Sequence, residues 1–250
     1  MARTAPTRGL PRVSAVIASR RVASEPDRLP RTLSLAVHEL RTPLAVASGY
    51  LRMLLREQAG PITDTQRKML EETAESCARI GALIAEMSEL EKVEAGDMTV
   101  PGTPFDFAAL IVELGGRANE GVDRGVRLEV RVTRPVMVTG DRTRLAAALG
   151  ALMHAALRER DEPGVIVVEC STLPDTSQTW ALVTIGDETI TRSLVDAALE
   201  PPPHFDEWRG GLGLALPVGR RVIEAHGGAL WSAPGDAPRA GSALRLPVAT

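Results

Sequence analysis

Residues 38–44 read His-Glu-Leu-Arg-Thr-Pro-Leu and lie inside a longer segment, residues 30–57, that has helical periodicity. The apolar residues of this segment recur at spacings of three, four or seven: Leu33, Val37, Leu40, Leu44, Leu51 and Leu55. Such spacing predicts a long amphipathic helix. This helix would carry His38 beside its apolar face, and Pro43 would bend it locally.

A second long helix is expected after the Gly-Pro pair at residues 60–61, with Thr63 or Asp64 as its N-cap and an end near Val93. Its seam residues alternate in spacing between three and four: Leu70, Thr73, Cys77, Ile80, Ile84 and Met87. Two such helices joined by a short loop form a helical hairpin. The apolar surface of one hairpin is too broad to be covered alone, so we expect a homodimeric four-helix bundle.

Composition excludes several classes of protein. The chain has 250 residues, of which 44% are hydrophobic and 24% charged, and this argues against a disordered, collagen-like or disulfide-rich chain. A formal net charge of −3 gives no general attraction for nucleic acid. Cys77 and Cys170 are too far apart for a zinc or redox motif, so no metal site is expected from them. No apolar run approaches the roughly 20 residues of a membrane span, and we expect a cytoplasmic protein without an integral membrane segment.

The chain divides into three parts. Residues 1–28 hold six arginines and read as a flexible basic arm, either solvated or used for docking to a partner or a membrane surface. Residues 29–97 form the hairpin, and prolines and a glycine at 101–104 mark a boundary before residues 98–250. In the last part we expect helices at 107–117, 141–160 and 212–226, with strands at 126–132, 136–139, 165–170, 180–185, 229–232 and 242–247. Helices alternating with mostly meandering strands predict a two-layer α/β sandwich, which makes the whole chain α+β.

The heptapeptide carries a set of groups suited to phosphoryl transfer. His38 offers a nucleophilic imidazole, Glu39 a carboxylate that can take its proton, and Thr42 a hydroxyl one helical turn away. A single helical histidine with an acidic neighbour is also common as an ordinary surface feature. The whole heptapeptide at the start of a helical hairpin is more specific than the histidine alone.

This segment resembles the dimerisation and phosphoacceptor domain of two-component sensor histidine kinases over residues 29–93. The resemblance continues more weakly through 144–248, which is similar to the family's ATP-binding domain. It implies that His38 is phosphorylated, that Glu39 acts as general base, and that Thr42 supports dephosphorylation of a partner response regulator. The implied partners are a second copy of the chain and a response regulator receiver domain, with another kinase or sensor protein as a further candidate.

The second glycine box of the family is matched by Gly210-Gly211-Leu212-Gly213-Leu214, followed by Glu224-Ala-His-Gly-Gly at the end of the next helix. The resemblance assigns Gly210, Gly211 and Gly213 to nucleotide binding, because glycines let backbone N–H groups approach phosphates at a helix start. The family's box usually opens with a further glycine. Here Arg209 stands in that place.

Other nucleotide-binding motifs are altered. The asparagine box places its two asparagines at positions that here hold Ala151 and Ala155, and alanine offers no oxygen ligand to Mg²⁺. His154 is adjacent and reads either as an exposed helical histidine or as a substitute ligand. The resemblance implies ATP and Mg²⁺ as cofactors, but these substitutions make us expect impaired binding of both.

The first glycine box should read Asp-x-Gly-x-Gly. Asp187 is retained at the position that binds the adenine amino group in the family, while Thr189 and Thr191 replace the glycines. Threonine disfavours positive φ and adds bulk where the nucleotide should approach. Asp187 therefore reads either as a nucleotide ligand or as an ordinary turn carboxylate. The lid between Asp187 and Gly210 is expected to be short, with a Pro-rich loop at 200–204.

Three functions remain open at this point. The first is phosphoryl transfer to or from a response regulator, or its dephosphorylation, through His38 without ATP. The second is a non-catalytic pseudokinase scaffold that binds a regulator. The third is an active autophosphorylating histidine kinase, whose ATP-dependent activity we expect to be impaired because losing one well-placed electrostatic group can cost about 10²–10³ in rate.

Overall fold

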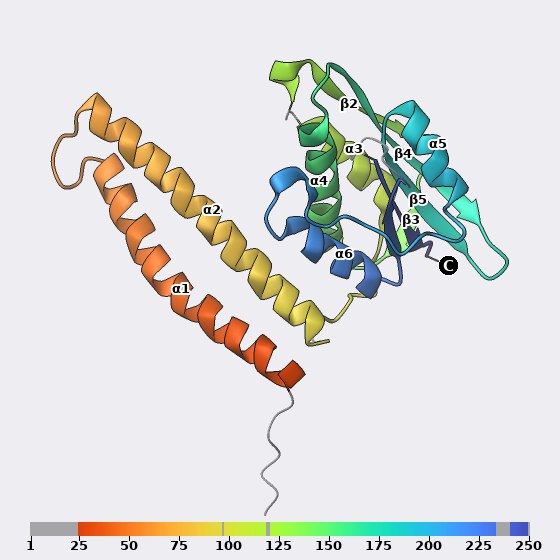
Figure 1. Cartoon of the computed structure of the whole chain (residues 1–250), viewed down its shortest axis with the longest axis horizontal. Coiled ribbons are helices and arrows are strands. Elements are labelled where there is room, and N and C mark those ends of the chain that lie inside the picture. The colour runs from red at the N-terminus through yellow and green to blue at the C-terminus, as the bar shows by residue number, and fades with distance from the viewer. Residues whose placement is uncertain (1–24, 97, 119–120, 234–240, 250) are drawn as a thin grey trace, which may run out of the picture.

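The computed structural model describes residues 25–96, 98–118, 121–233 and 241–249, in which a long helical hairpin precedes an α/β domain (Figure 1). Most of the expected basic arm, residues 1–24, lies outside the described residues. The first helix begins at Glu25, so the backbone of residues 25–28, assigned above to the arm, is helical.

The hairpin consists of α1 (Glu25–Leu55) and α2 (Asp64–Glu94), close to the two predicted helices. Thr63 is the N-cap of α2 and forms a capping box. The Thr63 side chain accepts from the Gln66 backbone N–H, and the Gln66 side chain accepts from the Thr63 N–H at 2.8 Å. Val37, Leu51 and Ile84 are buried between the helices. Among the described residues, no helix is both long and apolar enough to cross a membrane.

Large apolar side chains remain exposed along both helices of the hairpin. They are Leu35, Leu40, Val46, Tyr50, Met53 and Leu54 on α1, and Met69, Ile80 and Leu83 on α2. Exposed apolar surface of this extent is typical of a helical hairpin that packs against another element.

The α/β domain is built on a five-stranded mixed sheet with the order β2-β4-β5-β7-β6. Strands β2 and β4 are parallel, and the other neighbours are antiparallel. The strands of this sheet are β2 (Val126–Val132), β4 (Gly164–Pro174), β5 (Thr179–Gly186), β6 (Ala229–Ser232) and β7 (Ser242–Pro247). A separate antiparallel pair is formed by β1 (Pro104–Asp106) and β3 (Met137–Thr139).

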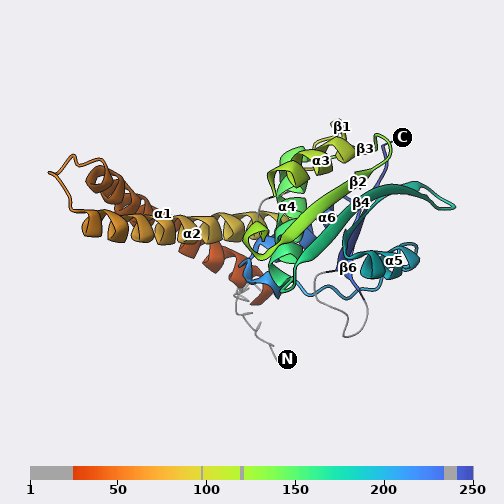
Figure 2. The same cartoon turned by 90° about the horizontal axis from the view of Figure 1, so that it is seen from above.

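Three helices cover one face of the sheet: α3 (Phe107–Arg117), α4 (Arg142–Glu159) and α6 (Ala215–Ala225). The main core lies between them and inward-facing residues such as Val168 and Val183. A fourth helix, α5 (Glu188–Asp196), packs on the opposite face, where Ile190 and Leu194 meet Trp231 (Figures 1 and 2). The α+β architecture with an α/β sandwich is confirmed, and α5 adds a partial third layer.

The α/β domain differs from the sequence-based expectations in two details. The segment after Asp187, which belongs to the expected lid, forms the helix α5, which was not predicted; Ile190 and Leu194 share one helical face that buries against the sheet. The helix predicted from 212 begins at Ala215, since Gly210, Gly211 and Gly213 all have φ between +59° and +70°. Pro217 is the third residue of α6, where a missing N–H costs no helical hydrogen bond.

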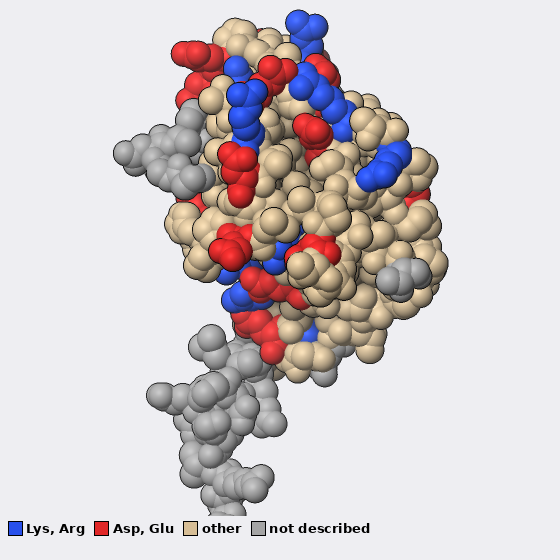
Figure 3. All heavy atoms as spheres, turned by 90° about the vertical axis from the view of Figure 1, so that its right-hand side faces the viewer, with Lys and Arg blue, Asp and Glu red and all other residues tan. Residues whose placement is uncertain are grey.

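The connection from α5 to α6 spans residues 197–214, and its first part passes the outer edge of the sheet at His204. The backbone N–H of Ser232 in the edge strand β6 donates to the carbonyl of His204 at 3.1 Å. On the face of the domain away from the hairpin, basic and acidic side chains are interspersed rather than separated by sign (Figure 3). The surface there offers no large field of one charge.

Candidate functional sites

The predicted phosphoacceptor residues lie in the middle of α1. His38, Glu39 and Thr42 are all exposed, and His38 and Thr42 are separated by one helical turn. Next to them, the Arg41 guanidinium donates to the Ser88 hydroxyl at 3.0 Å and ties α1 to α2. The hairpin therefore presents His38 from a fixed helix while leaving the imidazole open to a macromolecular partner.

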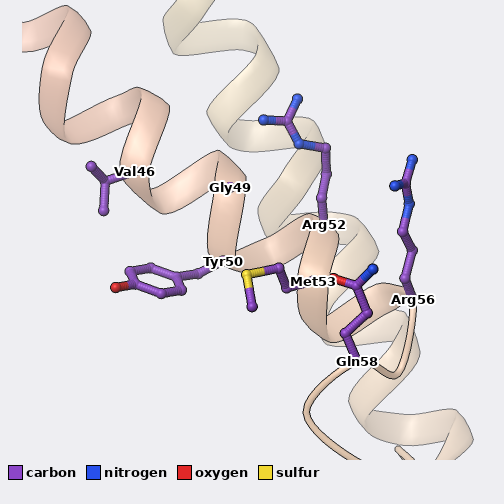
Figure 4. A pocket seen from close by; sticks show the side chains of 7 residues that line it. All are labelled: Val46, Gly49, Tyr50, Arg52, Met53, Arg56 and Gln58. Carbon is purple, nitrogen blue, oxygen red and sulfur yellow. The ribbon is translucent and has the colours of Figure 1, made fainter.

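A groove of about 580 Å³ begins on α1 two turns beyond His38 and extends past the end of the helix to Gln58 (Figure 4). Val46, Tyr50 and Met53 line it, and the figure shows these three side chains directed to one side of the helix. Arg52 and Arg56 border it. At 100° per residue, positions 38, 42, 46, 49 and 53 fall within one quadrant of the helix. His38 and the groove therefore share one face of α1.

Two nucleotide-motif positions of the α/β domain, Ala155 and Gly210, meet near the end of α4. They pack directly against each other there. Ala155 is fully buried, and a Cβ built on Gly210 would lie 3.1 Å from the Ala155 Cα and Cβ atoms. The second glycine box therefore lies directly on α4 at the place where the family's second asparagine is expected. Ala151 is half-buried one turn earlier.

Arg209 fills the junction between these motifs. Its side chain is 1% exposed, with the guanidinium 3.8 Å from the Glu159 carboxylate of α4 and 5.3 Å from the Phe205 ring centroid. The same guanidinium donates to the carbonyl of Gly241 at 3.2 Å. Burial lowers the pKa of Arg209, and the nearby carboxylates of Glu159 and Asp206 act in the opposite direction.

Asp187 is the N-cap of α5. Its Oδ1 accepts hydrogen bonds from the backbone N–H groups of Thr189 and Ile190, both at 2.9 Å. Gly186, which precedes it, lies beside Gly241, the residue that Arg209 contacts. The structure thus brings Asp187 and the second glycine box to the same end of the domain. There the aspartate caps a helix that leads the chain to the opposite face of the sheet.

Three observations describe the packing at the expected nucleotide motifs. An asparagine-box position is buried against Gly210, an arginine fills the junction, and the Oδ1 atom of Asp187 accepts two backbone hydrogen bonds. Within the described ranges, no group of three His, Cys, Asp or Glu side chains is arranged to hold a metal ion.

Sequence reasoning missed several residues that organise this region. Arg209 was noted only as a departure from glycine, and nothing in the sequence showed that it is buried. His226 ties the end of α6 to the start of α4, because its Nδ1 donates to the Val222 carbonyl and its Nε2 accepts from the Asp141 N–H at 2.9 Å. The Glu-Ala-His-Gly-Gly motif was the available signal for this histidine. Glu86 and Glu89 of α2, which contact the α/β domain, gave no signal.

Comparison with known proteins adds independent information. The family described as the His Kinase A (phospho-acceptor) domain matches residues 31–96. The signal transduction histidine-protein kinase BaeS of Escherichia coli is 28% identical over 204 residues, which are 78% of this chain and 42% of BaeS. Sensor protein GacS of Pseudomonas syringae is 28% identical over 245 residues, 92% of this chain and 26% of GacS. The chain spans less than half the length of these relatives.

Solved structures share the fold. The full-length structure of ShkA, in complex with AMPPNP, has a TM-score of 0.66 and 21% sequence identity to this chain. The matched region is 88% of this chain and 46% of the ShkA chain. The histidine kinase AdeS of Acinetobacter baumannii gives 0.52 at 20% identity, over 85% of this chain and 98% of its own. A hairpin followed by an α/β sandwich is therefore an architecture found in known histidine kinases.

Proposed function

Because the chain belongs to the two-component sensor histidine kinase family, we propose that it moves phosphoryl groups between His38 and the receiver domain of a response regulator without using ATP. The observation that carries this proposal is the open phosphoacceptor face of α1. His38, Glu39 and Thr42 are exposed there, and the same face continues into the groove at Val46 and Met53.

The proposed transfer between His38 and the regulator is reversible. A ring nitrogen of neutral His38 attacks the phosphorus of an aspartyl phosphate on the regulator, so that an N–P bond forms and the O–P bond breaks. The leaving aspartate keeps the electron pair of that bond. The Glu39 carboxylate takes the proton from the other ring nitrogen. In dephosphorylation, the Thr42 hydroxyl instead orients a water molecule toward the same phosphorus.

The groove on α1 supports a regulator as the partner. It combines the apolar side chains of Tyr50 and Met53 with the cations of Arg52 and Arg56, a composition that fits a partly apolar helix with acidic residues at its edge. It also lies on the helix face that bears His38, so a protein bound there would reach the imidazole. The exposed apolar residues Leu40, Leu54 and Ile80 support packing of a second hairpin into a four-helix bundle.

Independence from ATP is supported by the α/β domain. Phosphoryl transfer from ATP depends on Mg²⁺ and on donors placed around the phosphates. Here Ala151 and Ala155 supply no oxygen, and Arg209 fills the space between Glu159 and Gly241. With several electrostatic groups lost, each capable of changing the rate by about 10²–10³, autophosphorylation would be negligible.

The test is transfer from a regulator that carries a labelled aspartyl phosphate. The purified chain should become labelled on His38, and His38→Ala and His38→Gln should both abolish the label. Glu39→Gln should lower the transfer rate by about 10²-fold or more, because it removes the proton acceptor and keeps the shape. Thr42→Ala should slow release of phosphate while leaving transfer intact.

Two other outcomes would overturn the proposal. Label that reaches His38 from ATP with Mg²⁺ or Mn²⁺ would show an active autokinase. The absence of transfer from every regulator of the source organism, combined with regulator binding that survives His38→Ala, would show a pseudokinase scaffold. Arg52→Glu with Arg56→Glu should weaken regulator binding without changing the exposure of His38, which separates docking from chemistry.

A further inference from the structure

The second glycine box contacts α2 of the hairpin as well as α4. A Cβ built on Gly213, whose φ is +63°, would lie 2.6 Å from the Leu83 Cδ2 atom and 3.3 Å from the Glu86 Oε2 atom. A side chain at this position would have to displace the end of the Leu83 side chain, and the positive φ also favours glycine. Gly213 therefore has a packing role against α2 that needs no nucleotide.

A carboxylate of α2 occupies the start of α6. The Oε2 atom of Glu86 accepts a hydrogen bond from the backbone N–H of Leu214 at 2.9 Å. Leu214 is the N-cap of α6 and provides no side-chain cap of its own. In a capping box, a glutamate at the third helical position would accept from this N–H, but that position holds Pro217. Glu86 of another helix takes the role, at the end of α6 where negative charge is favoured.

An ion pair between α2 and α4 lies nearby, one turn further along α2. The Glu89 carboxylate is 3.0 Å from the Nε atom of Arg144 in α4, and Arg144 also reaches Asp141 at 3.2 Å. In Figure 2 the C-terminal part of α2 reaches α4 and α6. The hairpin is therefore fastened to the first turns of both helices.

We propose that the second glycine box is a docking site for a carboxylate-bearing helix, filled by α2 of the same chain, and that it holds the α/β domain against the hairpin. The proposal is independent of whether His38 exchanges phosphoryl groups with a regulator, so transfer can fail while docking stands.

The two glycines of the box offer a matched pair of variants. Gly211 has a φ of +59°, close to that of Gly213, but a Cβ there meets nothing within 4 Å. Alanine at either position carries a similar backbone strain, and only Gly213→Ala adds the clash with Leu83. Adding Leu83→Ala to Gly213→Ala should relieve that clash.

Glu86 offers a second pair. Burial raises the pKa of Glu86, while the hydrogen bond from Leu214 acts to lower it. Glu86→Gln keeps an oxygen acceptor and removes the cost of burying charge, so it should preserve docking. Glu86→Ala removes the acceptor and leaves the Leu214 N–H without its partner.

Hydrogen–deuterium exchange of the full chain measures docking directly. Glu86→Ala should speed exchange about fivefold in peptides covering 212–219 and 80–90, and Glu86→Gln should not. Gly213→Ala should speed exchange in the same peptides more than Gly211→Ala does. Adding Leu83→Ala to Gly213→Ala should slow this exchange again. Slow exchange in β5 would verify the fold of each variant, and the Glu86 pair still decides the outcome if Gly213→Ala does not fold.

Either of two results would overturn the proposal. The first is equal exchange in peptides 212–219 and 80–90 for Glu86→Ala and Glu86→Gln, and likewise for Gly213→Ala and Gly211→Ala. This result would show that α2 is not held at the second glycine box. Protection of peptide 209–219 of the unmodified chain by ATP with Mg²⁺, together with loss of protection in 80–90, would show that a nucleotide competes for the box.

Discussion

The hairpin and the α/β domain both carry residues of family motifs, but they hold them differently. On α1, His38, Glu39 and Thr42 are exposed and none of them is needed to bury the core. In the α/β domain, Gly210 lies against Ala155, and Arg209 is buried against Glu159. A retained motif residue can therefore indicate chemistry in one region and packing in the other. Substitution should separate the two regions, since it should alter reactivity in the hairpin and stability in the α/β domain.

The largest effect on stability is expected at Arg209. Arg209→Ala removes a buried cation 3.8 Å from the Glu159 carboxylate, and breaking a buried pair in this way costs about 3–5 kcal/mol. Chemical denaturation measures the loss. Arg209→Met combined with Glu159→Gln removes both charges and should cost clearly less than Arg209→Ala. A loss below about 1 kcal/mol for Arg209→Ala would mean that the junction is open enough to admit water or a ligand.

The two cysteines provide a chemical comparison of the regions. Burial raises the pKa of Cys170 to about 12, with Asp106 and Glu169 contributing, whereas Cys77 on α2 is half-buried. A shift from 9.0 to about 12 lowers the thiolate fraction at neutral pH roughly a thousandfold. Iodoacetamide with mass spectrometry should find Cys170 nearly inert at pH 8. The pKa of Cys170 is higher in the folded protein than in the unfolded chain. Its contribution to the free energy of unfolding should therefore fall as the pH rises from 9 toward 12.

The asparagine-box positions should respond unequally. Ala155→Asn places a larger polar side chain against Gly210 in a fully buried position and should cost about 1–3 kcal/mol. Ala151→Asn, one turn earlier and half-buried, serves as the control and should stay within about 0.5 kcal/mol. Thermal denaturation compares them. Nucleotide binding by the double variant, without loss of stability, would show that alanine alone had closed the site.

The smallest effect on stability is expected at the phosphoacceptor. His38→Gln and Thr42→Ala change exposed side chains and should leave the free energy of unfolding within about 0.5 kcal/mol of the parent. Under the proposed function, both substitutions should instead affect transfer and dephosphorylation. A clear loss of stability in His38→Gln would indicate that the histidine is structural, and the contrast between the two regions would fail.

Periodicity predicted most of the elements, most directly those that bury a single face. The segments 107–117, 126–132, 229–232 and 242–247 match the observed helix and strands at both ends. The helix α5 was missed because the family's first glycine box led us to expect a lid there. Ile190 and Leu194 were the available signal for a helix, but their partner Trp231 is distant in sequence.

The site was predictable where it depends on one helix and unpredictable where it depends on tertiary contacts. The spacing of His38 and Thr42 on one helix is a local property. The burial of Arg209 depends on Phe205 and on Gly241 brought together by the sheet. The contact of Glu86 with Leu214 joins residues 128 positions apart, and no local pattern encodes it.

The hydrogen bond from Ser232 to His204 has a consequence for self-association. Strand β6 lies at the margin of the sheet, and an uncovered margin can template pairing with another chain. The segment after α5 crosses this margin and takes up the Ser232 N–H. The prolines at 201–203 add no N–H donors of their own. A stretch that resemblance assigned to a nucleotide lid thus covers part of a sheet edge at which another chain could pair.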